Sequence, residues 1–74
     1  MSALIDELRR RPKLPEPAVA RAIRLAAGAS QEQVARELQV SSVTVRRWEA
    51  GSRRPTGQLR DDYCRLLAAL REVA

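Results

Sequence analysis

The sequence contains no histidine, a single cysteine and almost no aromatic residues. Trp48 and Tyr63 are the only aromatics among 74 residues, so a hydrophobic core must be built mainly from aliphatic side chains and alanine. Without histidine or a second cysteine, the chain cannot assemble a zinc site or an intramolecular disulfide by itself. We therefore interpret Cys64 as a small buried residue and expect no catalytic residues, no bound metal and no cofactor.

Long hydrophobic runs are also missing. No apolar stretch approaches the roughly 20 residues that span a bilayer. The first residues also lack the apolar segment of a secretory signal peptide. We expect a soluble, cytoplasmic protein with no membrane partner and no small-molecule ligand. At 74 residues the chain has room for one domain at most.

Positive charge is supplied almost wholly by arginine. The chain carries 14 Lys and Arg against nine Asp and Glu, which is a formal net charge of +5, and Lys13 is the only lysine. The planar guanidinium group suits phosphates and guanine edges better than a lysine ammonium does. This composition favours a nucleic-acid partner. Arginine codons in a GC-rich genome would produce the same excess, and composition alone does not separate the two explanations.

Alanine, leucine and arginine are strong helix formers, and their abundance predicts an all-α fold. Periodic apolar residues bounded by proline, glycine and hydroxyl side chains indicate a compact bundle of about five helices. We place these helices near residues 2–10, 17–27, 31–38, 42–50 and 57–73. Residues 12–17, PKLPEP, should run extended because prolines interrupt them. The chain thus divides into an N-terminal helix with a proline-rich linker, 1–17, and a helical domain, 18–74.

The apolar residues of each predicted helix define an expected inner face. In the last helix their steps of four and three residues match the seam of a coiled coil. That seam would pack on the domain itself, or would also serve a partner helix. The expected inner residues are Val19, Ile23, Ala26 and Ala27; Val34, Ala35 and Leu38; Val45 and Trp48; and Leu59, Tyr63, Leu66, Leu70 and Val73.

Residues 31–51, QEQVARELQVSSVTVRRWEAG, are predicted to form two short helices that meet at a tight corner. Ser30 and Gln33 have the spacing of a capping box at the start of the first helix, and Ser41 is the expected cap of the second. Gly51 stands where a glycine usually ends a helix. Two helices joined by a turn of about three or four residues form a helix-turn-helix.

Three motifs lie in register across this corner: Q-E-x-[LV]-A, V-S-x-x-T-[IV] and W-E-x-G-x-R-x-P. Together they resemble the Cro and phage-repressor family, also called the XRE family, over residues 18–55. The resemblance implies a lambda repressor-like DNA-binding domain whose partner is double-stranded DNA. The sequence departs from the family at Gln39, where glycine is usual, and this suggests a strained left-handed turn.

The resemblance also implies roles for individual residues. Helix 42–50 would lie in the major groove with its N-terminal residues at the base edges. Arg24 and Glu49 match an ion pair that ties the ends of the motif together, the alternative being two surface charges that never meet. The implied base-reading residues are Ser42, Val43 and Arg47, with Arg46 on the neighbouring outward face; the implied phosphate contacts are Gln31 and Thr44, with Arg53 and Arg54 as further ones.

The distribution of charge agrees with these roles. Residues 18–55 carry seven Arg against three Glu, whereas residues 56–74 carry three charges of each sign. The positive excess therefore falls on the predicted helix-turn-helix. For Arg53 and Arg54 the alternative is a solvated basic loop.

These features predict a sequence-specific DNA-binding protein that is not an enzyme. The first hypothesis is a small Cro-like transcriptional repressor of phage or prophage type, acting as a homodimer at least on DNA. The second is the DNA-binding antitoxin of a toxin–antitoxin pair. The third is a phage recombination directionality factor, although that class usually has W-I followed by a wing. The dimer interface would be the seam of the last helix or the stripe Leu4, Ile5 and Leu8.

Overall fold

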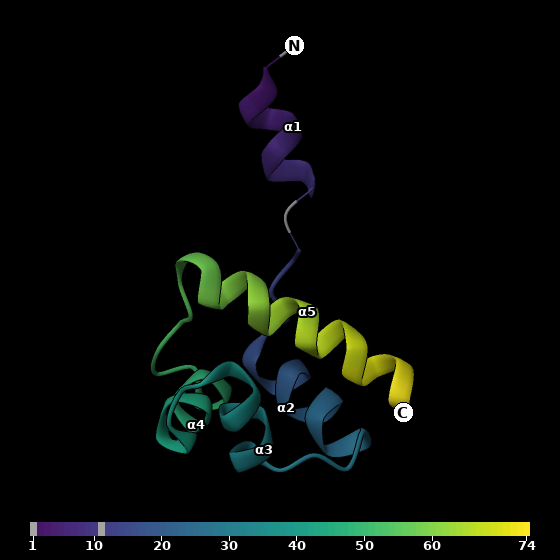
Figure 1. Ribbon diagram of the computed structural model, residues 1–74, viewed down its shortest axis with the longest axis vertical. Coiled ribbons are helices and arrows are strands. Elements are labelled where there is room, and N and C mark those ends of the chain that lie inside the picture. Colours follow the sequence, from purple (N-terminus) through teal and green to yellow (C-terminus); the bar gives the residue numbers. More distant parts are fainter. Residues whose placement is uncertain (1, 11) are drawn as a thin grey trace.

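Five helices follow one another along the chain. The computed structural model describes residues 2–10 and 12–74, and within these ranges it contains helices and no strands. None of the described helices is long and apolar enough to cross a membrane. The predicted all-α fold is confirmed. The helices are α1 (Ala3–Arg10), α2 (Pro17–Ala26), α3 (Gln31–Leu38), α4 (Ser42–Ala50) and α5 (Gly57–Val73) (Figure 1).

Side-chain caps begin the two helices at the corner. At the start of α3 the Gln33 N–H donates to Ser30 Oγ at 3.0 Å, and the Ser30 N–H donates to Gln33 Oε1 at 2.8 Å. This is the predicted capping box. At the start of α4 the Thr44 N–H donates to Ser41 Oγ at 3.2 Å. Each cap satisfies backbone donors that a helix start leaves without partners, so local sequence sets where both helices begin.

The core lies where α2 and α3 contact both α4 and α5 (Figure 1). The ring centres of Trp48 and Tyr63 lie 4.7 Å apart. Burial raises the pKa of Tyr63 to about 12, as a dry interior would. Cys64 is buried beside this core, as predicted. The core residues are Ala20, Ile23, Val34, Ala35, Val45, Trp48, Tyr63 and Leu67.

Two of the predicted inner faces are partly wrong. In α2, Val19 is 44% exposed, and the buried face includes Arg24. A search for periodic apolar residues does not count a charged residue as part of a buried face. In α5 the core contacts centre on Tyr63 and Leu67, and Val73 is 71% exposed. Leu59, Leu66 and Leu70 pack against this core as predicted. Leu67 was missed because apolar spacing alone does not give the direction from which α2 and α3 approach α5.

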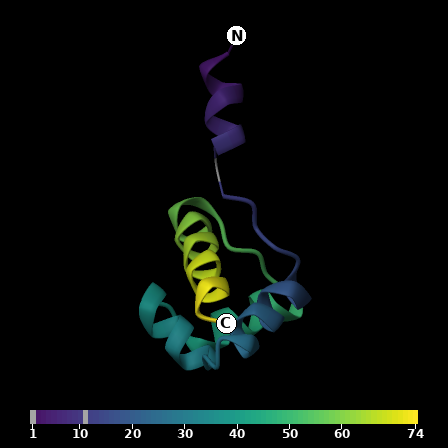
Figure 2. The same cartoon turned by 90° about the vertical axis from the view of Figure 1, so that its right-hand side faces the viewer.

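α1 stands away from the other four helices in both ribbon views (Figures 1 and 2). It has no buried residue, and it connects to α2 through an extended proline-rich linker. The linker is held to the body by Arg60, whose Nη1 donates to the Pro12 carbonyl at 3.0 Å. The apolar side chains of α1 thus remain exposed: Leu4 by 61%, Ile5 by 40% and Leu8 by 51%.

Gln39 ends α3 in a left-handed backbone conformation, with φ 58° and ψ 43°. In the part of the chain that the structure describes, it is the only residue other than glycine with positive φ. The Gln39 N–H donates to the Arg36 carbonyl, and the Val40 N–H donates to the Ala35 carbonyl. The backbone hydrogen bonds of the corner therefore depend on this conformation, and the predicted left-handed turn is confirmed.

Gln39→Gly should raise the melting temperature slightly. A left-handed conformation costs a residue with a Cβ about 1–2 kcal/mol. Glycine removes that cost, but it also gives the unfolded chain more freedom, so the net gain should stay below about 1 kcal/mol. Gln39→Ala keeps a Cβ and should give no gain, which makes it the matched control. A clear loss of stability in Gln39→Gly, measured by thermal unfolding, would contradict this account of the turn.

Candidate nucleic-acid interface

α4 has one buried face and one exposed face. Val45, Trp48 and Glu49 are buried against the bundle. At about 100° per residue, Val43 and Arg47 lie on the opposite side of the helix. Val43 is 37% exposed and Arg47 is exposed as well. The outward face of α4 therefore combines an apolar side chain with a cation, which suits contact with both thymine methyl groups and base-edge acceptors.

Of the other predicted base-reading residues, Arg46 lies on the same arc of α4, whereas Ser42 lies about 100° from Val43, towards the buried Glu49. Arg46 is exposed, and Ser42 is half-buried in the first turn. Sequence reasoning missed Ala50, which is exposed on this arc at the far end of the helix. Because the side chain of Ala50 is small, this end of α4 can approach a partner surface closely. The outward face of α4 thus extends over the full length of the helix.

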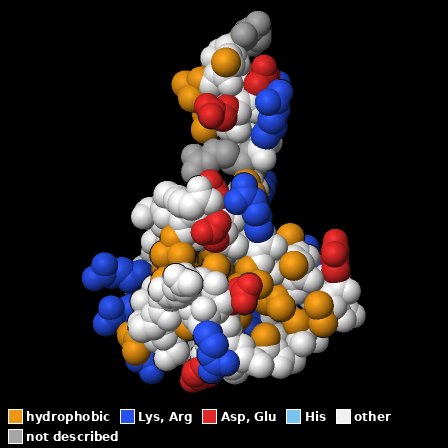
Figure 3. Space-filling model, viewed as in Figure 1, with side chains coloured by type: hydrophobic (Ala, Val, Ile, Leu, Met, Phe, Trp, Pro, Cys, Tyr) orange, Lys and Arg blue, Asp and Glu red, His pale blue; other side chains and the backbone are white. Residues whose placement is uncertain are grey.

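Arginines of the following loop gather beside this face. A depression of about 220 Å³ is lined by Thr44 and Arg47 of α4 and by Arg53 and Arg54 of the loop, among other residues. Figure 3 shows Lys and Arg side chains gathered on the left of the body, where Figure 1 places α4 and the loop after it. Tertiary structure therefore brings the predicted base-reading arginine and the predicted phosphate-binding arginines to one surface.

Sequence reasoning missed two further cations at this surface. A second depression, of about 200 Å³, is lined by Lys13 and Arg60 together with Arg53 and Arg54. Lys13 belongs to the proline-rich linker and Arg60 to α5, so they are distant in sequence from α4. Lys13 is the one basic residue within PKLPEP, and this was the only feature of the sequence that could have indicated a contact of the linker with the basic surface. The linker thus passes beside the basic loop, where it places the cation of Lys13 and the opposite charge of Glu16.

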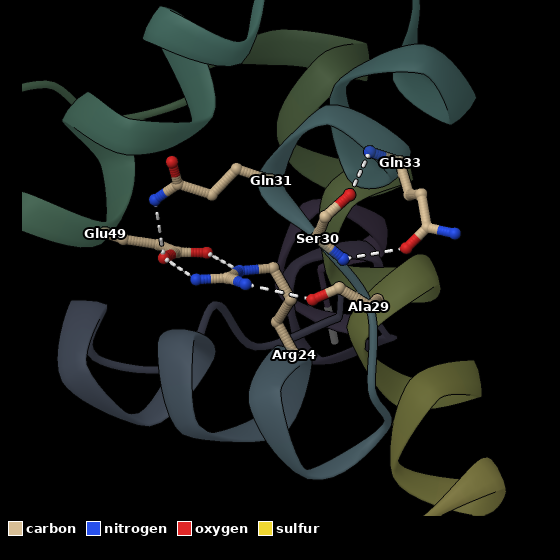
Figure 4. A network of polar contacts seen from close by, with 6 residues as sticks. All are labelled: Arg24, Ala29, Ser30, Gln31, Gln33 and Glu49. Carbon is tan, nitrogen blue, oxygen red and sulfur yellow. Dashed lines mark hydrogen bonds and ion pairs between the residues drawn. The ribbon is translucent and has the colours of Figure 1, made fainter.

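A buried ion pair joins α2 to α4 (Figure 4). Arg24 Nε donates to Glu49 Oε2 at 2.7 Å and Arg24 Nη2 donates to Glu49 Oε1 at 2.8 Å, so the pair is bidentate. Arg24 Nη1 also donates to the Ala29 carbonyl at 2.9 Å. Burial by itself raises the pKa of Glu49, but hydrogen bonds from Arg24 and Gln31 outweigh it and hold that pKa below its usual value. The network therefore stays charged and fixes α4 on the bundle.

Two of the residues predicted to contact phosphates, Gln31 and Thr44, make side-chain hydrogen-bond contacts within the protein. Gln31 Nε2 donates to Glu49 Oε1 at 3.1 Å, so the start of α3 is tied to the buried ion pair. The second amide hydrogen of Gln31 remains available to an outside acceptor. Thr44 Oγ1 and Ser41 Oγ lie 3.0 Å apart, within hydrogen-bond distance. Both side chains are thus held in place beside the outward face of α4.

Comparison with known proteins agrees with this geometry. The helix-turn-helix family model HTH_3 matches residues 21–68, which contain α3, the corner, α4 and most of α5. Searches of curated proteins and of solved structures found no match. The family match covers more than half of the chain, and the α3–α4 corner stands within it. The chain therefore belongs to the XRE-type helix-turn-helix family of DNA-binding proteins, the family of Cro and the phage repressors.

Proposed function

We propose that the protein is a sequence-specific transcriptional regulator, a small Cro-like repressor of phage or prophage type. The observation that supports this most directly is the outward face of α4, where Val43, Arg46 and Arg47 are exposed beside the arginines of the next loop. A helix with side chains is about 10–12 Å across and the major groove of DNA is about 12 Å wide. Repression would follow from occupying the operator.

Sequence recognition belongs to α4 in this proposal. Arg47 donates two hydrogen bonds to O6 and N7 of a guanine, which is the commonest specific contact of arginine with DNA. Val43 lies beside it and contacts a thymine methyl group. Arg46 reaches a neighbouring base edge from the same arc, and Ser42 does so from the first turn of α4. These contacts distinguish one sequence from another because they end on groups that differ between base pairs.

Positioning belongs to the surrounding residues. Arg53 and Arg54 contact phosphates after the end of α4, and Thr44 and Gln31 contact phosphates near the starts of α4 and α3. Such contacts set the register of a protein on the duplex and carry no sequence information directly. Residues 18–74 would thus form the DNA-binding domain, and residues 1–17 an appended segment with a separate task.

A dimer would supply selectivity that one α4 lacks. Nine residues of α4 reach only a few base pairs, and each correct base pair contributes about 1–3 kcal/mol of discrimination. A symmetric pair of chains doubles the number of bases that are read. Its half-sites should lie about one helical turn, 10–10.5 base pairs, apart.

An antitoxin role is the second candidate function. It is favoured by the exposed apolar stripe of α1, which a toxin could cover. A toxin reading frame beside the gene, and rescue of its toxicity by this chain, would distinguish an antitoxin from a repressor. A recombination directionality factor has less support, because the described residues contain no strands that could form a wing.

Selection of binding sites from random duplex DNA tests the proposal. We expect an enriched palindrome whose half-sites are about one helical turn apart. Footprinting of the selected sites should then show protection of both half-sites together. A pool without any enriched motif would contradict sequence-specific binding. Full affinity for one isolated half-site would contradict the dimer while leaving sequence recognition intact.

A further inference from the structure

α1 has an apolar stripe that nothing among residues 2–10 and 12–74 covers. At about 100° per residue, Leu4, Ile5 and Leu8 share one side of the helix, with Glu7 and Arg9 at its two flanks. All three apolar side chains are at least 40% exposed. A helix of eight residues is marginal in water on its own, because isolated helices need about 12–15 residues. The stripe therefore requires a partner surface.

The body of the molecule has an apolar groove that is equally uncovered. It is a shallow depression between α2 and the carboxyl end of α5, has a volume of about 460 Å³, and is open to solvent over most of its surface. Arg71 is its only charged lining residue, and within the described ranges Arg71 makes no ion pair. The lining residues are Ala18, Val19, Ala22, Ile23, Ala26, Arg71 and Ala74.

The shapes of the stripe and the groove match. Ala18, Ala22 and Ala26 are four residues apart, and this row of small side chains forms a trough along α2. Leu4 and Leu8 are also four residues apart and form a ridge along α1. Ridges and grooves of this spacing pack together in the commonest type of helix contact. The trough and α1 are each about 12 Å long at 1.5 Å per residue.

The charges match as well. Arg71 stands in the groove without an ion-pair partner among the described residues. Glu7 flanks the apolar stripe of α1. When α1 packs along the trough, Glu7 therefore lies at the edge of the groove. The pair Glu7–Arg71 would therefore set the orientation of the helix in the groove.

In the structure the groove is not occupied by the α1 of its own chain. In Figure 3 the apolar side chains of α1 face the left, whereas the apolar surface over α2 and the end of α5 lies at the lower right. The linker itself passes near Arg71, because Pro12, Lys13 and Pro15 line one depression together with Leu67, Ala68 and Arg71. The prolines keep residues 12–17 extended, and α1 stands away from the body in both ribbon views.

We propose that two copies of the chain exchange their α1 helices, so that each α1 packs in the α2–α5 groove of the other copy. A stable interface buries roughly 1,200–2,000 Å² in total, which one eight-residue helix does not reach, and reciprocal exchange doubles its contribution. A twofold arrangement of this kind is closed and limits assembly to a dimer. The groove lies away from the outward face of α4, so the exchange leaves that face free. This inference deepens the proposed dimer by naming its interface, and it does not depend on the proposed recognition of a DNA sequence.

Sedimentation equilibrium of the full chain without DNA tests the exchange. We expect a monomer–dimer equilibrium, and we expect Leu8→Asp in α1 and Ala22→Glu in the groove each to raise the dimer Kd by at least about tenfold. Ala22 is exposed, so Ala22→Glu does not disturb the core. Val73→Asp alters an exposed apolar residue at the same end of α5 but outside the groove, and should leave the Kd unchanged.

Mixing the two variants gives the decisive measurement. The mixed dimer keeps one intact contact, between the α1 of the Ala22→Glu chain and the groove of the Leu8→Asp chain. We therefore expect heterodimers to form more readily than either homodimer. Combining Glu7→Arg with Arg71→Glu should likewise recover dimerisation that each single reversal weakens. A chain that stays monomeric up to roughly millimolar concentration, or variants whose mixture shows no recovery, would overturn the exchange.

Discussion

Arg24→Met is expected to lower the free energy of unfolding by about 3–5 kcal/mol, because it leaves a buried carboxylate without its partner. Glu49 loses both hydrogen bonds from the guanidinium and retains only the one from Gln31. Methionine keeps the aliphatic length of the arginine stem, so the lost packing is small. A domain of 74 residues has a total stability of roughly 4–11 kcal/mol. Urea unfolding followed by Trp48 fluorescence measures the loss.

The double variant Arg24→Met with Glu49→Leu is the matched control. Replacing both charges with apolar groups removes the unpaired carboxylate, so most of the lost stability should return.

The pH dependence of the free energy of unfolding gives a second test of the unpaired carboxylate. In wild type the pKa of Glu49 is lowered, so its stabilisation is lost as pH falls through that pKa. In Arg24→Met burial raises the pKa instead, so the stability deficit relative to wild type should shrink as pH falls from 7 towards 4. A deficit that does not change with pH would contradict the unpaired carboxylate as its cause.

Arg47→Ala is expected to cost about 1–3 kcal/mol of binding free energy on the preferred DNA site and to flatten the preference at one base position. Arg47 lies opposite the buried face of α4, where a helix in the major groove meets base edges. If Arg47 makes the proposed contact, truncation removes two hydrogen bonds that only a guanine accepts in that geometry. Affinity for the selected site and for a scrambled duplex, measured over a series of salt concentrations, gives both effects.

Arg53→Ala is the comparison for Arg47→Ala. Arg53 is exposed in the loop after α4, and a phosphate contact there is the same for every sequence. Its loss should weaken all duplexes about equally and reduce the salt-dependence slope by about one unit. Equal weakening of selected and scrambled duplexes by Arg47→Ala would make Arg47 another phosphate contact and would move the base-reading face elsewhere on α4.

The helices and the corner followed from local sequence. Hydroxyl caps at Ser30 and Ser41 and the glycine stop at Gly51 act over a few residues, so their effects can be predicted without knowledge of the rest of the fold. The outward position of Val43 and Arg47 followed in the same way, because a helix turns by about 100° per residue and Trp48 marks the inner face. Short-range preferences of the backbone were enough for these features.

Apart from the Arg24–Glu49 pair, which the family resemblance implied, contacts between distant segments were decided only by tertiary structure. Arg24 lies in the buried face of α2, Lys13 lies beside the basic loop, and Gln31 donates to the buried Glu49. The distance of α1 from the groove on α2 and α5 was likewise decided by tertiary structure. Each of these depends on the direction in which one helix approaches another. That direction results from packing summed over many side chains, which no periodicity within a single helix contains.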